Sequence, residues 1–253
     1  MADEFTAFSL ILMRFTGFIF FSPVFGHRNI PIIVKNGMAL ISTILLFPVL
    51  KGSVTGLGEV TSLVLGVSLM RELLAGMVVG YVMNLFFAAL SYAGSIIDYD
   101  MGFSMASVYD PQTQMSVSIN GSLMQFFMIA LFFATDCHIQ FFSMMAASSK
   151  MIPFGQPVQV VRAAEAVLAI FVQSMELALK LAFPMIAIQL MVQAAVGVLM
   201  RMIPQIDIFA VNVQLKILCG LAVLLFIISP LGSELEKLFV MMFQDVGQIL
   251  TIL

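Results

Sequence analysis

The chain has 253 residues, of which 61% are hydrophobic and 10% are charged, with a formal net charge of −3. Soluble domains average about 45–50% apolar and about 25% charged residues, and the mean hydropathy of +1.09 departs from them in the same direction. So few charged side chains cannot cover the surface of a water-soluble globule of this size. The net negative charge also provides no positive electrostatic field that would attract the phosphates of a nucleic acid. The composition therefore excludes most soluble enzymes and nucleic-acid-binding proteins, and it indicates a chain embedded in lipid or enclosed by other subunits.

Several apolar stretches are long enough to cross a hydrocarbon layer, which takes about 20 residues of helix. None of them shows the alternation of apolar and polar residues that is typical of strands. The predicted helices cover residues 5–21, 31–49, 59–97, 121–149, 158–200 and 208–228, followed by a short amphipathic helix at 234–253. Pro184 predicts a kink, and Pro230 predicts the end of the helix at 208–228. The predicted fold class is all-α, a membrane-protein-like bundle of long, kinked helical hairpins.

A linker that contains Pro153, Gly155 and Pro157 divides the chain near its midpoint. Residues 1–150 form the first predicted half and include a polar central loop at 98–120. Residues 151–253 form the second half, a hairpin of two long apolar helices with a charged turn at 201–207, followed by the tail helix.

Charged residues fall inside or close to the apolar helices, where insertion scales assign a cost of about 2.5–3.5 kcal/mol to each. Glu176 and Lys180 stand four residues apart, so they are predicted to pair on one helix face. Arg71 and Glu72 are predicted to pair with other helices. Three interpretations of these charges stay open at this point: snorkelling at helix ends, pairing at helix or subunit interfaces, and a proton or ion relay. The charges concerned are Arg14, Arg71, Glu72, Glu176, Lys180 and Lys216.

The central loop carries the most informative pattern in the chain. Asp98, Asp100 and Asp110 bring three carboxylates into it, and Gly102 and Pro111 are expected to set its bends. Flexible methionines and aromatic residues alternate with polar ones, and thioethers can seal a gap and repack when something passes. One interpretation is a plain interhelical loop, and the sharper one is a loop that lines or closes a pore. The residues of the second interpretation are Met101, Gly102, Phe103, Met105, Tyr109, Asp110, Pro111 and Met115.

Four blocks of residues, in this order, carry a resemblance to a known family. They are Arg14-Phe15-Thr16-Gly17 with Ser22-Pro23-Val24-Phe25-Gly26, Ile30-Pro31 and Lys35; Ala93-Gly94-Ser95-Ile96-Ile97 with Met101-Gly102-Phe103-Ser104 and Asp110-Pro111; Arg201-Met202-Ile203-Pro204-Gln205 with Ile208-Phe209; and Lys216. Together they resemble the FliR/SctT family of type III secretion export-gate proteins, over nearly the whole chain. The family often has Gly and Gln where Asp98 and Asp100 stand, and it commonly has Gly and Pro where Asn212 and Gln214 stand.

The resemblance implies a non-enzymatic subunit of the flagellar type III protein export gate, in the bacterial inner membrane at the flagellar basal body. Expected partners are FliP-like and FliQ-like subunits, which would form a closed pore with it, then FlhB-like and FlhA-like components, unfolded export substrates and membrane lipid. Nucleic acid is not expected. The first half of the chain would resemble FliP and the second half FliQ, and the central loop would act as the plug. The implied interface or structural charges are Arg71, Glu72, Glu176, Lys180, Arg201 and Lys216.

Two alternatives belong to other classes. A virulence-type SctT subunit would share the same blocks, although the chain length and the block around Asp110-Pro111 favour the flagellar branch. A small-molecule or ion transporter would use broken helices and binding carboxylates such as Asp98. An enzyme is not expected, because His27 and His138 lie outside any recognised catalytic motif. We expect no catalytic residue, no cofactor and no metal site.

Overall fold

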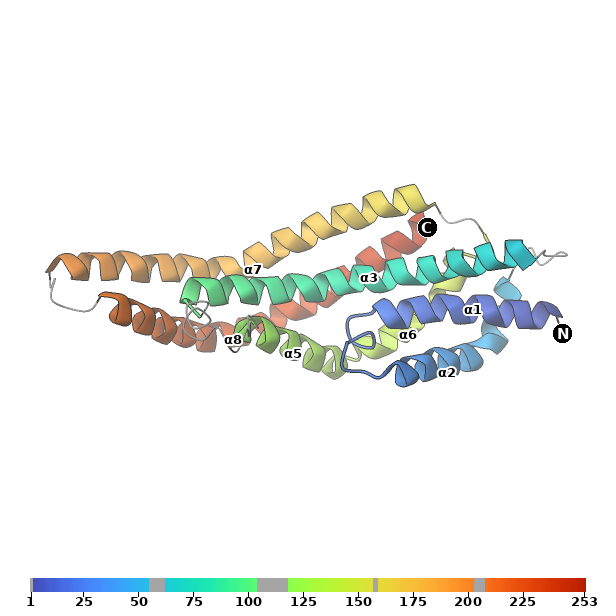
Figure 1. The fold of residues 1–253 in the computed structure, drawn as a ribbon, viewed down its shortest axis with the longest axis horizontal. Coiled ribbons are helices and arrows are strands. Elements are labelled where there is room, and N and C mark those ends of the chain that lie inside the picture. Colours follow the sequence, from blue (N-terminus) through green and yellow to red (C-terminus); the bar gives the residue numbers. More distant parts are fainter. Residues whose placement is uncertain (1, 55–61, 104–117, 157–158, 203–207) are drawn as a thin grey trace. The chain divides into compact units, whose positions relative to one another are not determined.

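The computed structural model describes residues 2–54, 62–103, 118–156, 159–202 and 208–253, and within them it is helical (Figure 1). An isolated parallel bridge joins Val54 and Phe154 in these residues. The predicted all-α fold is thus confirmed. The helices are α1 (Ala2–Phe21), α2 (Ile32–Leu50), the short 3-10 helix η1 (Lys51–Ser53), α3 (Ser62–Met101), α5 (Ile119–Ala134), α6 (Cys137–Met151), α7 (Val160–Met202) and α8 (Ile208–Ile252).

Length and composition mark the described helices as membrane-type. Four of them are long and apolar enough to cross a membrane, and the total reaches six if two bent pairs each count as one span. The four are Glu4–Phe21, Ile32–Leu50, Leu63–Met101 and Val161–Leu199. Large apolar side chains also face outward, as at Phe226, which is 83% exposed. Exposed apolar faces of this kind need lipid or another subunit to cover them.

Several helix boundaries differ from those that the sequence predicts. The helix predicted to end at residue 97 continues to Met101 as α3, so Asp98 and Asp100 lie in its last turns and not in the predicted loop at 98–120. The predicted helix at 121–149 is two helices, α5 and α6, because Asp136 adopts φ 56° and interrupts the helical hydrogen bonds. Aspartate is among the few residues that adopt this left-handed conformation at low cost. The predicted end at Pro230 is wrong, because α8 continues from Ile208 to Ile252. A proline removes one backbone donor, and a helix can bend at that point and continue beyond it.

The chain folds into two compact units that do not follow the order of the sequence. Unit 1 comprises Met1–Phe86, Phe132–Val172 and Leu238–Leu253, and unit 2 comprises Phe87–Leu131 and Gln173–Lys237. The predicted division at residue 150 rests on the resemblance of the first half to FliP and of the second half to FliQ. That division stays a prediction.

Unit 1 has an aromatic core. The ring of Phe25, in the turn after α1, lies 5.3 Å from the ring of Phe141 and 6.5 Å from that of Phe132. Between α1 and α2, the rings of Phe8 and Phe47 pack edge to face at 5.8 Å. Such pairs add about 0.5–1.5 kcal/mol to the burial of the rings themselves, so they hold α1, α2 and α6 together.

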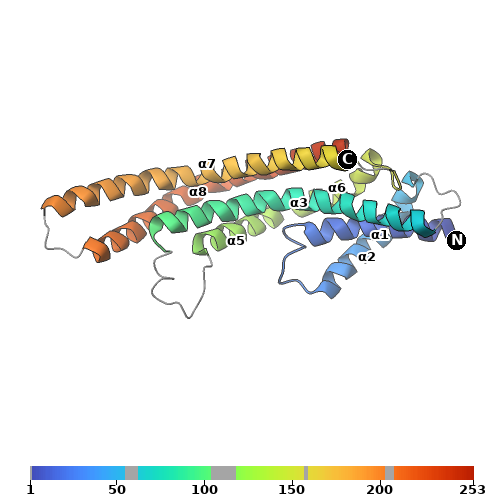
Figure 2. The same cartoon turned by 45° about the horizontal axis from the view of Figure 1, so that its top comes forward.

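Unit 2 contains the facing parts of α7 and α8, which run side by side and antiparallel (Figure 2). A polar contact joins them, because the Gln189 side-chain amide donates to the backbone carbonyl of Lys216 at 2.9 Å. The predicted hairpin of two long apolar helices is therefore present. Pro184 lies inside α7.

Candidate functional site

Two glycines allow α1 and α3 to approach closely in unit 1. A Cβ atom on Gly17 would meet the backbone carbonyl of Leu73, and one on Gly76 would meet the backbone carbonyl of Arg14. Small residues at such contacts are typical of helix pairs in membranes. Arg14 stands one turn before Gly17, and Glu72 stands one turn before Gly76, so the close contact brings the two charged side chains together.

Arg14 and Glu72 form a buried ion pair. The Nε of Arg14 donates to Oε2 of Glu72 at 2.6 Å, and the two side chains are 1% and 2% exposed. The Nη1 of Arg14 also donates to the backbone carbonyl of Ile152 at 2.8 Å, just past the end of α6. Glu72 in turn accepts from the backbone N–H of Gly155 through Oε1 at 2.9 Å. The pair therefore ties three segments together: α1, α3 and the stretch after α6.

The stretch after α6 encloses this ion pair. The guanidinium carbon of Arg14 lies 4.0 Å from the ring centre of Phe154, a cation–π contact. Phe154 is fully buried, and its backbone pairs with Val54. Nη2 of Arg14 is buried without a hydrogen-bond partner. A charge so enclosed is costly unless it is paired, which makes Glu72 essential to the packing of unit 1.

In unit 2, the C-terminus of α3 carries the first described residues of the predicted plug. The N–H of Gly102 donates to the carbonyl of Tyr99 at 3.2 Å, and the N–H of Phe103 donates to the carbonyl of Asp98 at 3.0 Å. These two bonds form a Schellman motif, which needs the left-handed φ of 84° that Gly102 adopts. Gly102 therefore ends α3 and begins the central loop, as its predicted role as a bend requires.

Asp98 joins the two ends of the central loop. Its carboxylate accepts from Oγ of Ser118 at 2.6 Å, and from Nδ2 and the backbone N–H of Asn120 at 2.6 and 3.1 Å. Ser118 also caps α5 by accepting from the N–H of Gly121 at 2.8 Å. A carboxylate at a helix N-terminus interacts favourably with the helix dipole as well. We name this set of Asp98, Ser118 and Asn120 the loop clasp.

The loop clasp depends on a close contact between α3 and α5. A Cβ atom on Gly94 would meet the backbone of Gly121, so the two helices touch there. Asp98 stands one turn after Gly94 on the same face of α3, which aims it at the start of α5. Met101, a further turn on, is fully buried against Gly220 of α8, with its sulfur 3.6 Å from Nδ2 of Asn120. In this structure Met101 thus packs between helices.

The other predicted charges have different surroundings. Glu176 and Lys180 pair at 2.8 Å, as their spacing predicts, but the Lys180 and Glu176 side chains are 73% and 62% exposed. Lys216 interacts electrostatically with Asp100, one of whose carboxylate oxygens is buried without a hydrogen-bond partner. Arg71 and Arg201 are exposed. Five predicted plug residues, Met105, Tyr109, Asp110, Pro111 and Met115, lie outside the residues that the structure describes.

Sequence reasoning missed the partner of Glu72 and the loop clasp. The sequence shows Arg14 as a charge within a helix and as part of a family block, but it indicates no partner for it. One sequence pattern could have predicted the pair. Two apolar helices each carry a charged residue one turn before a glycine, and the two charges have opposite signs. Asp98 and Asn120 show a weaker form of this signal, with Gly94 and Gly121 nearby.

Apolar helices of spanning length, a buried ion pair and a clasped polar loop together define a polytopic helical membrane protein. The sequence profile of the family described as "Bacterial export proteins, family 1" matches residues 5–242 of the chain. The chain therefore belongs to this family, which includes the FliR proteins.

Relatives in distant bacteria carry one name, flagellar biosynthetic protein FliR. The protein of Bacillus subtilis (strain 168) is 26% identical over 99% of this chain and 96% of its own length. That of Pectobacterium carotovorum is 30% identical over 94% of this chain and 90% of its own length. That of Escherichia coli (strain K12) is 27% identical over 95% and 91%. The likeness thus extends along nearly the whole of both chains.

Proposed function

We propose that this protein is a non-enzymatic subunit of the flagellar type III protein export gate, in the bacterial inner membrane. The observation that carries the proposal is the family match over residues 5–242, together with relatives named for flagellar biosynthesis. The relatives' names favour the flagellar branch over the virulence branch.

In this proposal the protein joins FliP-like and FliQ-like subunits around a closed pore. The outward-facing apolar side chains of α7 and α8 support it, because a face such as that of Leu225 and Phe226 needs apolar partners. The same hairpin would be the FliQ-like part of the chain. Co-expression with FliP-like and FliQ-like chains is expected to yield a stable complex, and expression alone is expected to yield aggregation or degradation. A well-behaved monomer in mild detergent would contradict this.

We further propose that the central loop plugs the pore at rest. Apolar side chains close a pore by excluding water, and thioethers deform around a passing peptide. Both ends of the loop are held by described contacts, the glycine cap at Gly102 and the loop clasp. These contacts involve only residues of α3 and α5 and those next to them, so they hold both ends of the loop.

Deletion of residues 104–117, with a short Gly-Ser linker in their place so that Ser118 and the loop clasp remain, tests the plug. The assembled complex should remain, while the permeability of the membrane to small solutes should rise. A sharper variant replaces Met105, Tyr109 and Met115 together with serine, and its matched control replaces the polar Gln112, Thr113 and Gln114 with serine. Only the first should leak, and Met105→Ala alone should leak less, because neighbouring methionines can refill the gap. An assembled complex that stays tight after the deletion would refute the plug, and failed assembly without a leak would favour a purely structural loop.

A further inference from the structure

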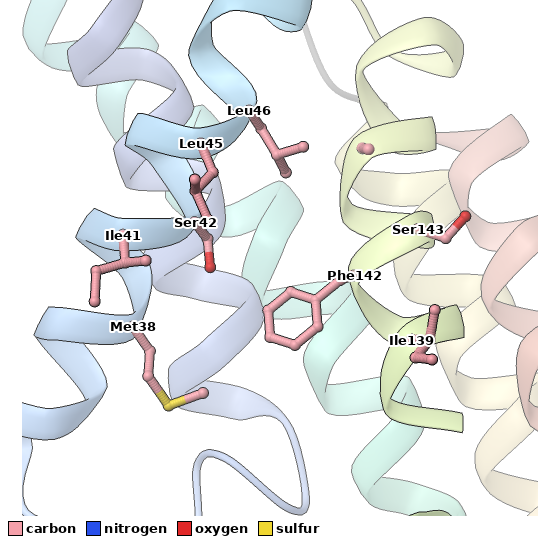
Figure 3. A pocket seen from close by; sticks show the side chains of 9 residues that line it. Met38, Ile41, Ser42, Leu45, Leu46, Ile139, Phe142 and Ser143 are labelled. Atoms are coloured by element: carbon pink, nitrogen blue, oxygen red, sulfur yellow. The ribbon is translucent and has the colours of Figure 1, made fainter. Parts of the chain in front are cut away.

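The buried polar groups that lack partners do not line the apolar groove of unit 1. That groove lies between α2 and α6 (Figure 3), and its side-chain lining is apolar apart from the hydroxyls of Ser42 and Ser143. Three described residues of unit 2, in contrast, each carry a buried side-chain oxygen without a hydrogen-bond partner. They are Asp100 on α3, Gln189 on α7 and Asn212 on α8. Leaving a buried acceptor unsatisfied is costly, so a donor for these oxygens is expected nearby.

The three oxygens lie around one turn of α8. The side-chain nitrogen of Gln189 donates to the backbone carbonyl of Lys216, which places the oxygen of the same amide beside this turn. Asn212 stands one turn before Lys216 on the same face of α8. Asp100 interacts electrostatically with the Lys216 ammonium. Lys216 is therefore the residue that the three acceptors have in common.

The packing of α3 against α8 brings Asp100 to this turn. A Cβ atom on Gly220, one turn after Lys216, would overlap the side chain of Met101, so the two helices touch there. Asp98 and Asp100 are two residues apart on α3 and therefore do not share a face. Asp98 holds α5 through the loop clasp, while Asp100, next to Met101, is directed to α8.

Among the basic residues of unit 2, Lys216 is the one placed to serve these oxygens. The others are Lys180, Arg201 and Lys237. Lys180 and Lys237 form exposed ion pairs with glutamates one turn away, and Arg201 is exposed. The ammonium of Lys216 is half-buried and forms no ion pair with another described residue. An ammonium has three donors on a flexible four-carbon stem, and three acceptors surround this one.

We propose that Lys216 is a latch whose ammonium closes onto Asp100, Gln189 and Asn212 and fixes the end of α3 to the α7–α8 hairpin. The motion is a rotation of the lysine side chain, because the contacts at Gly220 and Gln189 already hold the three helices together. Closing gives the buried oxygens their donors and gives the ammonium a counter-charge. The central loop begins directly after this end of α3, so the latch couples the hairpin to the loop. The inference concerns contacts within unit 2 and not the export role, so it can fail or succeed independently of the proposed function.

A zero-length crosslink tests the contact. The full-length protein, with any subunits that co-purify, is treated in mild detergent with dicyclohexylcarbodiimide. This reagent joins a carboxylate to a touching amine as an amide, and the displaced oxygen leaves in the urea of the reagent. Mass spectrometry of digests should find Lys216 joined to Asp100. Asp100→Asn should abolish this crosslink, and the matched control Asp136→Asn, at an exposed position of unit 1, should leave it unchanged. The exposed pair of Glu176 and Lys180 should crosslink in every sample.

Two results of this experiment would overturn the proposal. One is the absence of a crosslink between Lys216 and Asp100 in samples where Glu176 is joined to Lys180. The other is a crosslink of Lys216 to a carboxylate of another chain, which would place its counter-charge in a partner subunit.

A reversal of charge tests what the latch holds. Hydrogen exchange is measured at the amides of Gly102 and Phe103, which close the end of α3. Lys216→Glu should accelerate their exchange about tenfold or more, because two carboxylates would then face each other without a donor. The exchanged pair, Asp100→Lys with Lys216→Glu, supplies a new ammonium to the same oxygens and should restore exchange to within about threefold of the unchanged protein. Lys150→Glu, at an exposed position of unit 1, is the matched control and should have no effect.

Acceleration that the exchanged pair does not reverse would show that Lys216 acts through its packing alone, and it would overturn the latch. Unchanged exchange in Lys216→Glu would overturn it too, because the ammonium would then hold nothing. Should Lys216→Glu fail to fold, Lys216→Met takes its place, and adding Asp100→Leu should reverse part of the acceleration; a double variant that exchanges faster than Lys216→Met would count against the latch.

Discussion

The buried ion pair between Arg14 and Glu72 makes the strongest prediction for stability. Glu72→Gln keeps the shape of the side chain and can still accept from the N–H of Gly155, but it leaves the guanidinium without a counter-charge. Because the two side chains are 1% and 2% exposed, water cannot compensate. Removing one partner of such a pair costs about 3–5 kcal/mol. Arg14→Met should cost at least as much, since it strands the carboxylate and also frees the Ile152 carbonyl, which adds about 1–3 kcal/mol.

The double variant, Arg14→Met with Glu72→Gln, separates pairing from packing. It contains no stranded charge. Its remaining defects are the Ile152 carbonyl, which has lost its donor, and the amide nitrogen introduced at position 72, which has no acceptor. We therefore expect the double variant to lose about 2–6 kcal/mol from two unpaired neutral groups, less than Arg14→Met alone and far less than the sum of the two single variants. Such strong coupling is expected only of residues in direct contact.

A thiol-reactive fluorophore measures these losses, because Cys137 is 4% exposed in the folded chain and becomes accessible when unit 1 unfolds. A change of 1 kcal/mol shifts Tm by about 2–4 °C in a chain of this size, so Glu72→Gln should lower Tm by about 6–20 °C. Lys237→Gln removes one partner of an exposed ion pair and should shift Tm by very little. A Glu72→Gln shift no larger than that of this control would refute the reasoning. A double variant as unstable as the sum of the singles would refute it too.

Three further predictions concern the helix contacts. Gly76→Val should force α1 away from α3 and lower Tm more than any exposed glycine substitution, because the new side chain would overlap the backbone of α1. Asp98→Ala should leave the buried donors of Asn120 unpaired at a cost of about 1–3 kcal/mol, and hydrogen exchange at the start of α5 should accelerate; unchanged exchange would argue against the clasp. Lys180→Met should leave the Tm of the single chain unchanged, because the Glu176–Lys180 pair is exposed in it. If a partner subunit covers that face, Lys180→Met should lower the yield of assembled complex, and adding Glu176→Gln should restore part of that yield. Equal yields for the unchanged protein, the single variant and the double variant would show that the pair stays in solvent.

Much of this protein could be predicted from local patterns. Runs of apolar residues longer than a bilayer span, without the alternation that is typical of strands, satisfy their backbone hydrogen bonds as helices. The pairing of Glu176 with Lys180 follows from the helical repeat alone. The bend at Gly102 follows from the ease with which glycine adopts a positive φ, although the helix before it runs four residues beyond its predicted end. Each of these interactions lies within a few neighbouring residues, so the sequence by itself determined them.

The tertiary structure decided which distant residues meet. Arg14 and Glu72 are 58 residues apart, and Asp98 and Asn120 are 22 apart, so no helical repeat relates them. Their pairing depends on where two helices touch, which is set by the absence of a side chain at Gly76 and at Gly94. The break between α5 and α6 lies within a mostly apolar stretch and could not be predicted from it. Asp136 makes the break by adopting a left-handed backbone conformation, which aspartate can adopt but does not require. The sequence shows that a charge within an apolar helix needs a partner, but the packing of the helices determines which residue that partner is.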